Sequence, residues 1–127
     1  MFESPSRHSR SPLKTIENAH PALSTKVEHR LDLPELCPHT HNPKAGSHLW
    51  IRYETGDRLL ELFALEDYIL GFQGHTVVRD VEYFVQEVAL DCAAALKSRV
   101  EVEANIELNG LKQGQRVTVS VDGTALA

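Results

Sequence analysis

Apolar and polar residues alternate in four segments of the chain, and a central region with a different period divides these segments into two pairs. The first pair covers Thr25 to Leu33 and His48 to Glu54, and the second covers Val100 to Leu108 and Val117 to Val121. Strict alternation is typical of strands with one covered face and one face in water. The Asn109-Gly110 turn signal inside the second pair predicts a closing hairpin.

The central region predicts two helices. Apolar residues recur every three or four positions between Leu60 and Phe72, and the helix is expected to end before Gly71 to Gly74. A longer amphipathic helix is expected after this break, with its water-facing side formed by Glu82, Gln86, Glu87 and Asp91. The order of elements predicts an α+β fold, an antiparallel four-stranded sheet with two helices on one face. Such a sheet has two open edges, which further copies of the chain would cover.

The length of 127 residues fits one domain with a terminal tail. Residues 1–15 are rich in Ser, Arg and Pro and lack an apolar period, which predicts a disordered tail ahead of a folded domain at residues 16–127. The net charge of −5 gives no reason to expect DNA or RNA as a partner. No apolar run approaches the ~20 residues that span a bilayer, so we expect a cytoplasmic protein without a membrane partner.

One loop gathers the reactive residue types of the chain. The segment from Leu36 to Lys44, LCPHTHNPK, combines a cysteine, two histidines, a lysine and two Pro steps that favour extended or turn conformations. A cysteine reacts as its thiolate, and cationic or hydrogen-bond-donating neighbours lower its pKa. Cys37 is therefore a candidate nucleophile, and His39, His41 and Lys44 are candidate activating groups. A buried thiol at the end of a strand is the alternative interpretation.

The same segment offers residue types that zinc accepts, and these are Cys37, His39, His41 and His48. Their spacing departs from the common zinc patterns, because three ligands from five residues would need an unusually tight wrap. We therefore expect no metal site. The second cysteine, Cys92, lies in the apolar stripe of the second helix and is expected to be a core residue. Both cysteines are expected to be free thiols.

Around this loop the chain resembles the 7-cyano-7-deazaguanine reductases, the nitrile reductases of queuosine biosynthesis. The resemblance rests on the complete Cys-Pro-x-Thr-x-x-Pro motif that begins at Cys37, on Glu61, and on Asn18-Ala19-His20-Pro21 before the first strand. It extends from about residue 17 to residue 121 and includes the order of elements. The resemblance implies a tunnelling fold, in which ββααββ units assemble into an oligomeric barrel and purine-like or pterin-like ligands bind between subunits.

The resemblance also implies a reaction and its residues. In the family, the cysteine attacks the nitrile carbon to form a covalent thioimide, which NADPH reduces by two hydride transfers to the aminomethyl base. Cys37 matches that nucleophile, and Asp80 stands where the family has the Glu that holds the base. Glu61 matches the first residue of a nucleotide-associated motif, Arg79 replaces the His beside the substrate Glu, and His75 matches an upstream His. The implied partners are a 7-deazaguanine-like base and further copies of this chain.

Two departures bear on the implied chemistry. The family has a proton-donating Asp directly after the second Pro of the motif, where this chain has Lys44, whose ammonium group can also donate a proton or stabilise charge. The motif Glu-Ser-Lys-Ser-Leu-Lys-Leu-Tyr, part of the family's NADPH site, loses both lysines and reads here Glu61-Leu62-Phe63-Ala64-Leu65-Glu66-Asp67-Tyr68. Cofactor phosphates need cations or N–H donors, and a carboxylate in their place repels them.

These departures leave several functions open. The first is an NADPH-dependent reductase-like protein that acts through Cys37. The second is an NADPH-independent relative that adds ammonia to the nitrile to make an amidine. The third is a noncatalytic tunnelling-fold module for binding or assembly. The fourth is a zinc-dependent hydrolase like the GTP cyclohydrolases, which resemble this fold more distantly.

Overall fold

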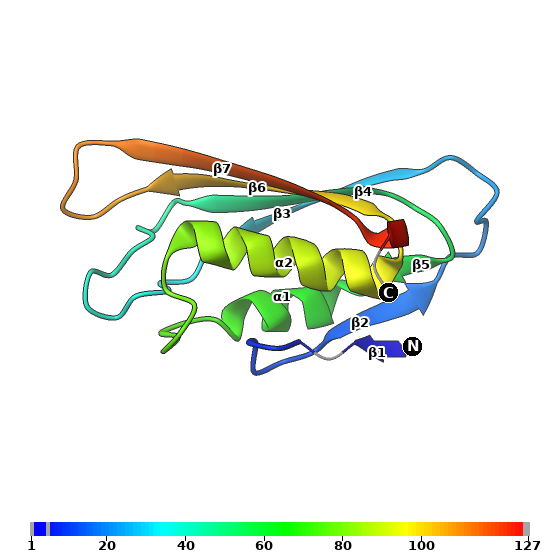
Figure 1. The fold of residues 1–127 in the computed structure, drawn as a ribbon, viewed down its shortest axis with the longest axis horizontal. Helices are drawn as coiled ribbons and strands as arrows, with labels where there is room; N and C mark the ends of the chain where they lie inside the picture. Colours follow the sequence, from blue (N-terminus) through cyan, green and yellow to red (C-terminus); the bar gives the residue numbers. More distant parts are fainter. Residues whose placement is uncertain (1, 5, 126–127) are drawn as a thin grey trace.

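The fold is built around an antiparallel sheet of four strands (Figure 1). The computed structural model describes residues 2–4 and 6–125. The strands lie in the order β3 (Lys26–Asp32), β4 (His48–Glu54), β6 (Arg99–Glu107) and β7 (Gly114–Asp122). Ile51 at the centre of β4 lies opposite His29 on one side and Val102 on the other. The alternating segments therefore form the strands that the sequence predicted.

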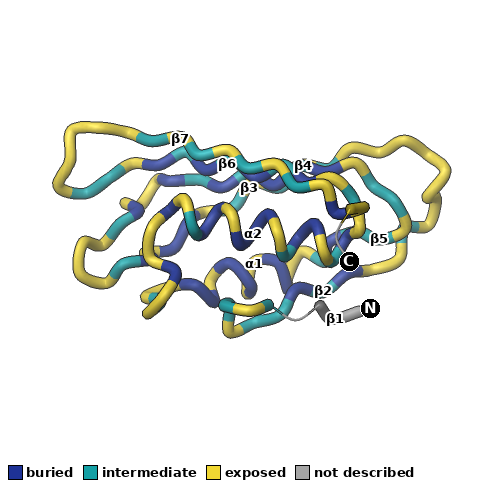
Figure 2. The backbone as a smooth tube through the Cα atoms, viewed as in Figure 1, coloured by how far each residue is buried: buried dark blue, intermediate teal, exposed yellow. Residues whose placement is uncertain are grey.

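Two helices cover one face of this sheet, as predicted. They are α1 (Leu62–Leu70) and α2 (Val81–Leu96), and α2 packs against β6 and β7 (Figure 1). The inward side chains of β4 and β6 are fully or almost fully buried against α2, whereas the opposite faces of these strands stay partly exposed (Figure 2). Cys92 is buried in this core, which confirms its expected place. Neither helix of the described chain has the length and apolar content that a bilayer crossing requires.

The described part of the N-terminal segment, residues 2–4 and 6–15, differs from the disordered tail expected for residues 1–15, and the prediction for residues 1 and 5 lies outside the described residues. The structure contains a second, three-stranded sheet in the order β1 (Phe2–Ser4), β2 (Leu13–Glu17) and β5 (Arg58–Leu60). Leu13 and Thr15 in β2 are only 1% and 2% exposed. This packing arises because β2 pairs with the edge of β5, which lies close to the helices. The pairing that stabilises β2 therefore comes from residues more than 40 positions away in the sequence. Strands of three to five residues are too short to show an alternating pattern.

Between β1 and β2, residues Ser6–Arg10 lie across the helices, and we name this segment the N-terminal strap. Arg7 pairs with the carboxylate of Glu87, and the Ser6 hydroxyl donates to Asp91 at 2.9 Å. Glu87 is only 4% exposed, and Asp91 is half-buried. The expectation that both carboxylates face water was therefore wrong, because the strap covers this side of α2. Burial raises the pKa of Asp91, and hydrogen bonds from Tyr68 and Ser6 oppose this shift.

One inward side chain of β3 makes stability dependent on pH. The Nε2 atom of His29 is buried without a hydrogen-bond partner in the described residues, and the ring stacks on Tyr53 with centroids 5.8 Å apart. Burial lowers the pKa of His29, so the unfolded chain binds a proton more readily than the folded chain. The free energy of unfolding that depends on a neutral His29 is therefore fully present above the ordinary histidine pKa of about 6.5. It is lost as the pH falls through the lower pKa that His29 has in the folded protein.

Replacing His29 by Phe is expected to flatten the acid side of the stability profile. The aromatic ring keeps its stacking partner, and the titrating group is gone. Urea unfolding of both proteins at several pH values measures the effect as the difference between their free energies of unfolding. If this difference stayed constant from neutral to mildly acidic pH, the assignment to His29 would be wrong. The exposed His20 supplies a control in His20→Ala, which is expected to follow the wild type.

Candidate functional site

The loop between β3 and β4 folds into a tight turn that begins at Cys37. The backbone N–H groups of Leu36 and Cys37 both donate to the carbonyl of Asn42, at 2.9 and 3.1 Å, and His41 N–H donates to the carbonyl of Cys37 at 2.9 Å. His41 adopts a left-handed conformation with φ of 59°, and the Asn42–Pro43 peptide bond is cis. The turn thus returns the chain to its starting point and leaves the Cys37 side chain partly exposed.

The turn between β6 and β7 anchors this loop. The Oδ1 atom of Asn42 accepts from the Asn109 N–H at 2.6 Å, and the Asn109 side chain donates to the carbonyl of His41 at 2.8 Å. The backbone N–H of Lys44 donates to the carbonyl of Glu107 at 2.9 Å. These bonds join positions more than 60 residues apart, which fixes the loop relative to the sheet. The Asn42 side chain therefore has a structural task, which is to hold the loop to the turn after β6.

The surroundings of Cys37 favour its thiolate. Hydrogen bonds from the Thr40 side chain and from the backbone N–H groups of Thr40 and His39 lower the pKa of Cys37 to about 7, and the positive charge of Arg79 acts in the same direction. Partial burial opposes the shift without cancelling it. Cys92 is the opposite case, because complete burial raises its pKa far above neutrality. The surroundings of Cys37 therefore raise the fraction of its nucleophilic thiolate at neutral pH, whereas those of Cys92 suppress it.

Arg79 reaches the site because two loops are hydrogen-bonded to each other. Gly74, in the loop between α1 and α2, donates its N–H to the carbonyl of Glu35 at 2.9 Å. The carboxylate of Glu35 in turn bonds Nδ1 of His41 at 2.9 Å. Arg79 lies in the same interhelical segment and is exposed, and within the part of the chain that the structure describes it forms no ion pair. Its guanidinium group is free to act on the thiolate or on an anionic ligand.

His75 has both ring nitrogens occupied. Its Nδ1 atom accepts from the N–H groups of Val77 and Val78, at 3.0 and 2.8 Å. An Nδ1 acceptor requires the proton on Nε2, which donates to the carbonyl of His8 at 2.9 Å. His75 therefore holds backbone segments together and offers no free hydrogen-bonding nitrogen to a ligand.

The two implied binding carboxylates are helix caps at different places. Asp80 begins α2 and accepts from the Tyr83 N–H at 2.9 Å through Oδ2, and it follows Arg79 directly. Glu61 begins α1 and accepts from the N–H groups of Phe63 and Ala64, at 3.2 and 2.6 Å. Glu61 lies at the end of α1 away from the loop that leads to α2, so the structure brings Asp80 and not Glu61 towards the Cys37 loop (Figure 1).

The α1 surface does not fit the phosphates of a nucleotide cofactor. Phe63, which stands where the family motif has its first lysine, is 79% exposed, and Leu62 beside it is 64% exposed. A pocket of about 270 Å³ at this surface is lined by Lys14 and by the carboxylate-bearing Glu61 and Asp67. One cation against two carboxylates repels a phosphate overall, and the carboxylate of Glu61 already binds the helix N-terminus.

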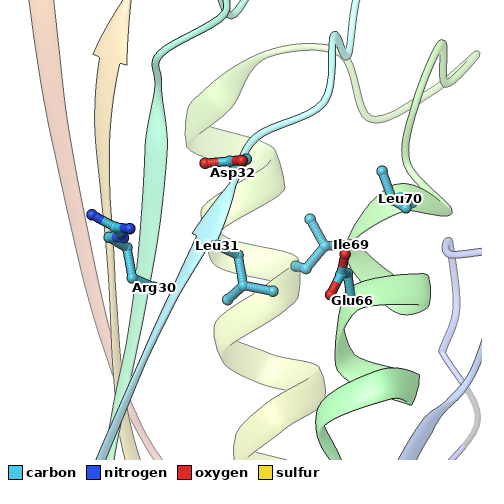
Figure 3. A pocket seen from close by; sticks show the side chains of 6 residues that line it. All are labelled: Arg30, Leu31, Asp32, Glu66, Ile69 and Leu70. Atoms are coloured by element: carbon cyan, nitrogen blue, oxygen red, sulfur yellow. The ribbon is translucent and has the colours of Figure 1, made fainter.

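A second pocket, of about 360 Å³, opens between β3 and α1 (Figure 3). Leu31 and Ile69 point towards each other across it, and Asp32 and Glu66 add carboxylates. Its lining contains no cysteine, serine, threonine, lysine or histidine. Across residues 2–4 and 6–125, no group of three or more His, Cys, Asp or Glu side chains is arranged to hold a metal ion. His41 and His48 are instead close to Glu35 and Asp32, at 2.9 and 3.5 Å.

Thr40 lowers the pKa of Cys37 and is the candidate site residue that sequence reasoning missed, although its place in the Cys-Pro-x-Thr motif was a usable signal. Replacing Thr40 by Val removes the hydroxyl and keeps the shape, so the pKa of Cys37 is expected to rise. Alkylation by iodoacetamide is then expected to slow severalfold at neutral pH and to match the wild type at high pH, where both thiols are ionised. Thr55→Val, at the far end of β4, serves as the control. Identical pH profiles for Thr40→Val and the wild type would contradict the assignment.

No protein-family model matches the chain. No curated protein matches it either.

Proposed function

We propose that this chain is a divergent relative of the 7-cyano-7-deazaguanine reductases and that Cys37 captures the nitrile of a 7-deazaguanine-like base as a covalent thioimide. The observation that carries the proposal is the partly exposed Cys37 thiol with a pKa of about 7 inside a complete Cys-Pro-x-Thr-x-x-Pro motif. A nitrile carbon is an electrophile that a thiolate attacks readily. A purely structural cysteine has no need of surroundings that lower its pKa.

The proposed step is an addition that balances without a redox partner. The thiolate of Cys37 forms a bond to the nitrile carbon, one π-electron pair of the nitrile moves onto nitrogen, and this nitrogen takes up a proton. Lys44, which occupies the position of the family's acidic proton donor, is the proposed source of that proton. Arg79, whose charge already acts on the thiol, stabilises negative charge that develops beside it.

Asp80 is the proposed holder of the base. Its Oδ2 atom caps α2, and Oδ1 forms no hydrogen bond among the described residues, so one carboxylate oxygen is available to ring N–H groups. Asp80 follows Arg79, whose charge acts on the thiol, which supports a base pocket that leads from Asp80 to Cys37. His75 is not included, because its nitrogens are already bonded to Val77, Val78 and His8.

Assembly of several copies forms part of the proposal. Within the described strands, β3 pairs only with β4 and β7 pairs only with β6, so both outer edges of the larger sheet lack a partner. Subunits that join at these edges would build the ββααββ barrel implied by the resemblance. A site between subunits would also explain why Cys37 is still partly open to solvent in one chain.

The proposed reaction ends at the thioimide. NADPH supplies hydride when it is bound to the family enzymes, but the exposed Phe63 and the carboxylates of Glu61 and Asp67 on the α1 surface do not fit its phosphates. We expect added NADPH to leave the thioimide unreduced. Release of the aminomethyl base with consumption of NADPH would contradict this point and would restore the complete reductase reaction.

Mass spectrometry of the intact protein tests the proposal. Incubation with 7-cyano-7-deazaguanine is expected to add one base mass to the wild type and none to Cys37→Ala. A noncatalytic module is the second candidate, and Lys44 in place of the acidic donor favours it. That candidate predicts binding of the base that is unaffected by Cys37→Ala, with no mass increase in either protein. Formation of an amidine from ammonium and a nitrile-bearing RNA would instead support the NADPH-independent relative.

A further inference from the structure

The N-terminal strap is held to the helices at several points. Ser6 and Arg7 bond to Asp91 and Glu87 of α2, and the Ser9 hydroxyl donates to the carbonyl of Tyr68 in α1 at 2.6 Å. The Nε2 atom of His8 lies 3.0 Å from the Tyr83 hydroxyl and 3.3 Å from the Glu87 carboxylate. A segment that merely covers apolar surface does not need this set of charged and hydrogen-bonded contacts.

The strap is also hydrogen-bonded to the loop between α1 and α2. The carbonyl of His8 accepts from Nε2 of His75, and the Arg10 guanidinium donates to the carbonyl of Gln73 at 3.3 Å. His75 then fixes the following residues through its bonds to the N–H groups of Val77 and Val78. Its ring also lies against Phe72 in the core, with centroids 5.8 Å apart.

The loop between α1 and α2 is also linked to the segment that carries Cys37. Gly74, adjacent to His75, bonds the carbonyl of Glu35 two residues before Cys37, and Arg79 acts on the Cys37 thiol through its charge. Physical contacts therefore run without a break from the strap, through His75, to the Cys37 loop. Each contact involves a backbone group or a buried ring, which leaves little freedom for the two loops to separate.

We propose that the N-terminal strap positions the reactive site through His75, which ties the strap to the interhelical loop and holds that loop against the Cys37 loop. The inference rests on the proposed function, since it treats Cys37 as the nucleophile. His75 and the backbone of His8 are positioning groups in this account, because neither contacts the thiol. Without the His75–His8 hydrogen bond the interhelical loop can move, and Arg79 moves with it, so the Cys37 thiolate is expected to lose the part of its stabilisation that Arg79 supplies.

Two substitutions test the link between the strap and the interhelical loop, one by removing the His75–His8 hydrogen bond and one by displacing the strap itself. In His75→Asn the side-chain oxygen can still accept from Val77 and Val78, but the shorter side chain cannot reach the carbonyl of His8. In Gly71→Ala the new methyl group would lie 2.1 Å from the Ser9 hydroxyl and 3.0 Å from the Arg10 nitrogen, so the Ser9 side chain must turn away, which breaks its bond to Tyr68, and the strap backbone at Arg10 must give way slightly. Gly56→Ala is the matched control, since nothing lies within 4 Å of a methyl group there.

The rate of Cys37 alkylation by iodoacetamide, measured as a function of pH, is the main readout. Both His75→Asn and Gly71→Ala are expected to raise the apparent pKa of Cys37 by about half a unit and so to lower the rate about twofold at neutral pH. The rates at high pH and the profile of Gly56→Ala are expected to match the wild type. Hydrogen exchange is expected to be faster at Gly74 in His75→Asn and unchanged at Val77 and Val78.

Unchanged pH profiles in both variants, with Gly74 still protected, would overturn the inference and leave the strap as a cover for α2. If His75→Asn does not fold, Gly71→Ala decides the question by itself. Alkylation needs no base or cofactor, so the two proposals fail separately. A shifted thiol pKa without capture of the nitrile base would end only the proposed function, and capture with an unshifted thiol pKa would end only this inference.

Discussion

Iodoacetamide is expected to alkylate the wild-type protein at Cys37 alone, and Cys37→Ala is expected to lose nearly all reactivity at neutral pH. The two thiols differ in every property that controls the reaction. Cys37 is partly exposed with a pKa of about 7, whereas Cys92 is fully buried with a pKa raised by burial and by the nearby Asp91. Cys92 reacts only when the core opens, which reduces its rate by about a hundredfold or more.

Peptide mapping after short exposure to the reagent measures this difference directly. Cys92→Ala is the control, and its labelling at Cys37 is expected to follow the wild type as a function of pH. The rate at Cys37 is expected to rise through neutral pH, because the thiolate fraction rises there. Equal labelling of the two cysteines in the native protein, or a Cys37 rate that increases only at alkaline pH, would remove the basis for a nucleophilic role.

Replacing Phe84 by Ala is expected to lower the free energy of unfolding by about 3–5 kcal/mol, the usual cost of removing a buried aromatic ring. Phe84 is fully buried on α2, and its ring meets Phe72 edge to face with centroids 5.0 Å apart. Phe72 lies in turn against His75, so this cluster joins the core to the interhelical loop. The resulting cavity cannot collapse easily between a helix and a sheet.

Chemical denaturation of Phe84→Ala beside Phe63→Ala measures this effect with a matched control. Phe63 is the same residue type at 79% exposure on α1, and its removal is expected to change stability by less than about 0.5 kcal/mol. Similar losses for the two variants would show that Phe84 does not occupy the core as described. A gain in stability for Phe63→Ala would not affect the argument, because an exposed ring is not part of the core.

The long elements of the fold could be predicted from the sequence because their periods persist over many residues. The strands of the larger sheet have seven to nine residues, and α2 has sixteen, so alternation and helical spacing are clear. The small sheet could not be predicted, because β5 has three residues and β2 has five. These strands are stabilised by pairing with each other, with Thr15 opposite Leu60, and pairing between distant segments leaves no local pattern in the sequence.

The candidate site, too, could be predicted only in part from the sequence. Cys37 could be found from residue types alone, because cysteine, histidine, lysine and proline converge in one short loop. The role of His75 could not, because its partner is a backbone carbonyl 67 residues away in the strap. The buried Glu87 looked like a water-facing helix residue, since its partner Arg7 lies 80 residues away in a segment without an apolar pattern. Glu61 is a helix cap, and an N-terminal Glu with this task has the same sequence signature as a ligand-binding one.

Ultraviolet difference titration with 7-cyano-7-deazaguanine, run on the wild type beside Cys37→Ala, detects covalent capture by Cys37 without any further reagent. We expect a new absorption band of the thioimide in the wild type, which grows as the pH passes through the pKa of Cys37 and is absent in Cys37→Ala. Absence of the band in the wild type, or the same spectral change in both proteins, would contradict covalent capture of the nitrile by Cys37.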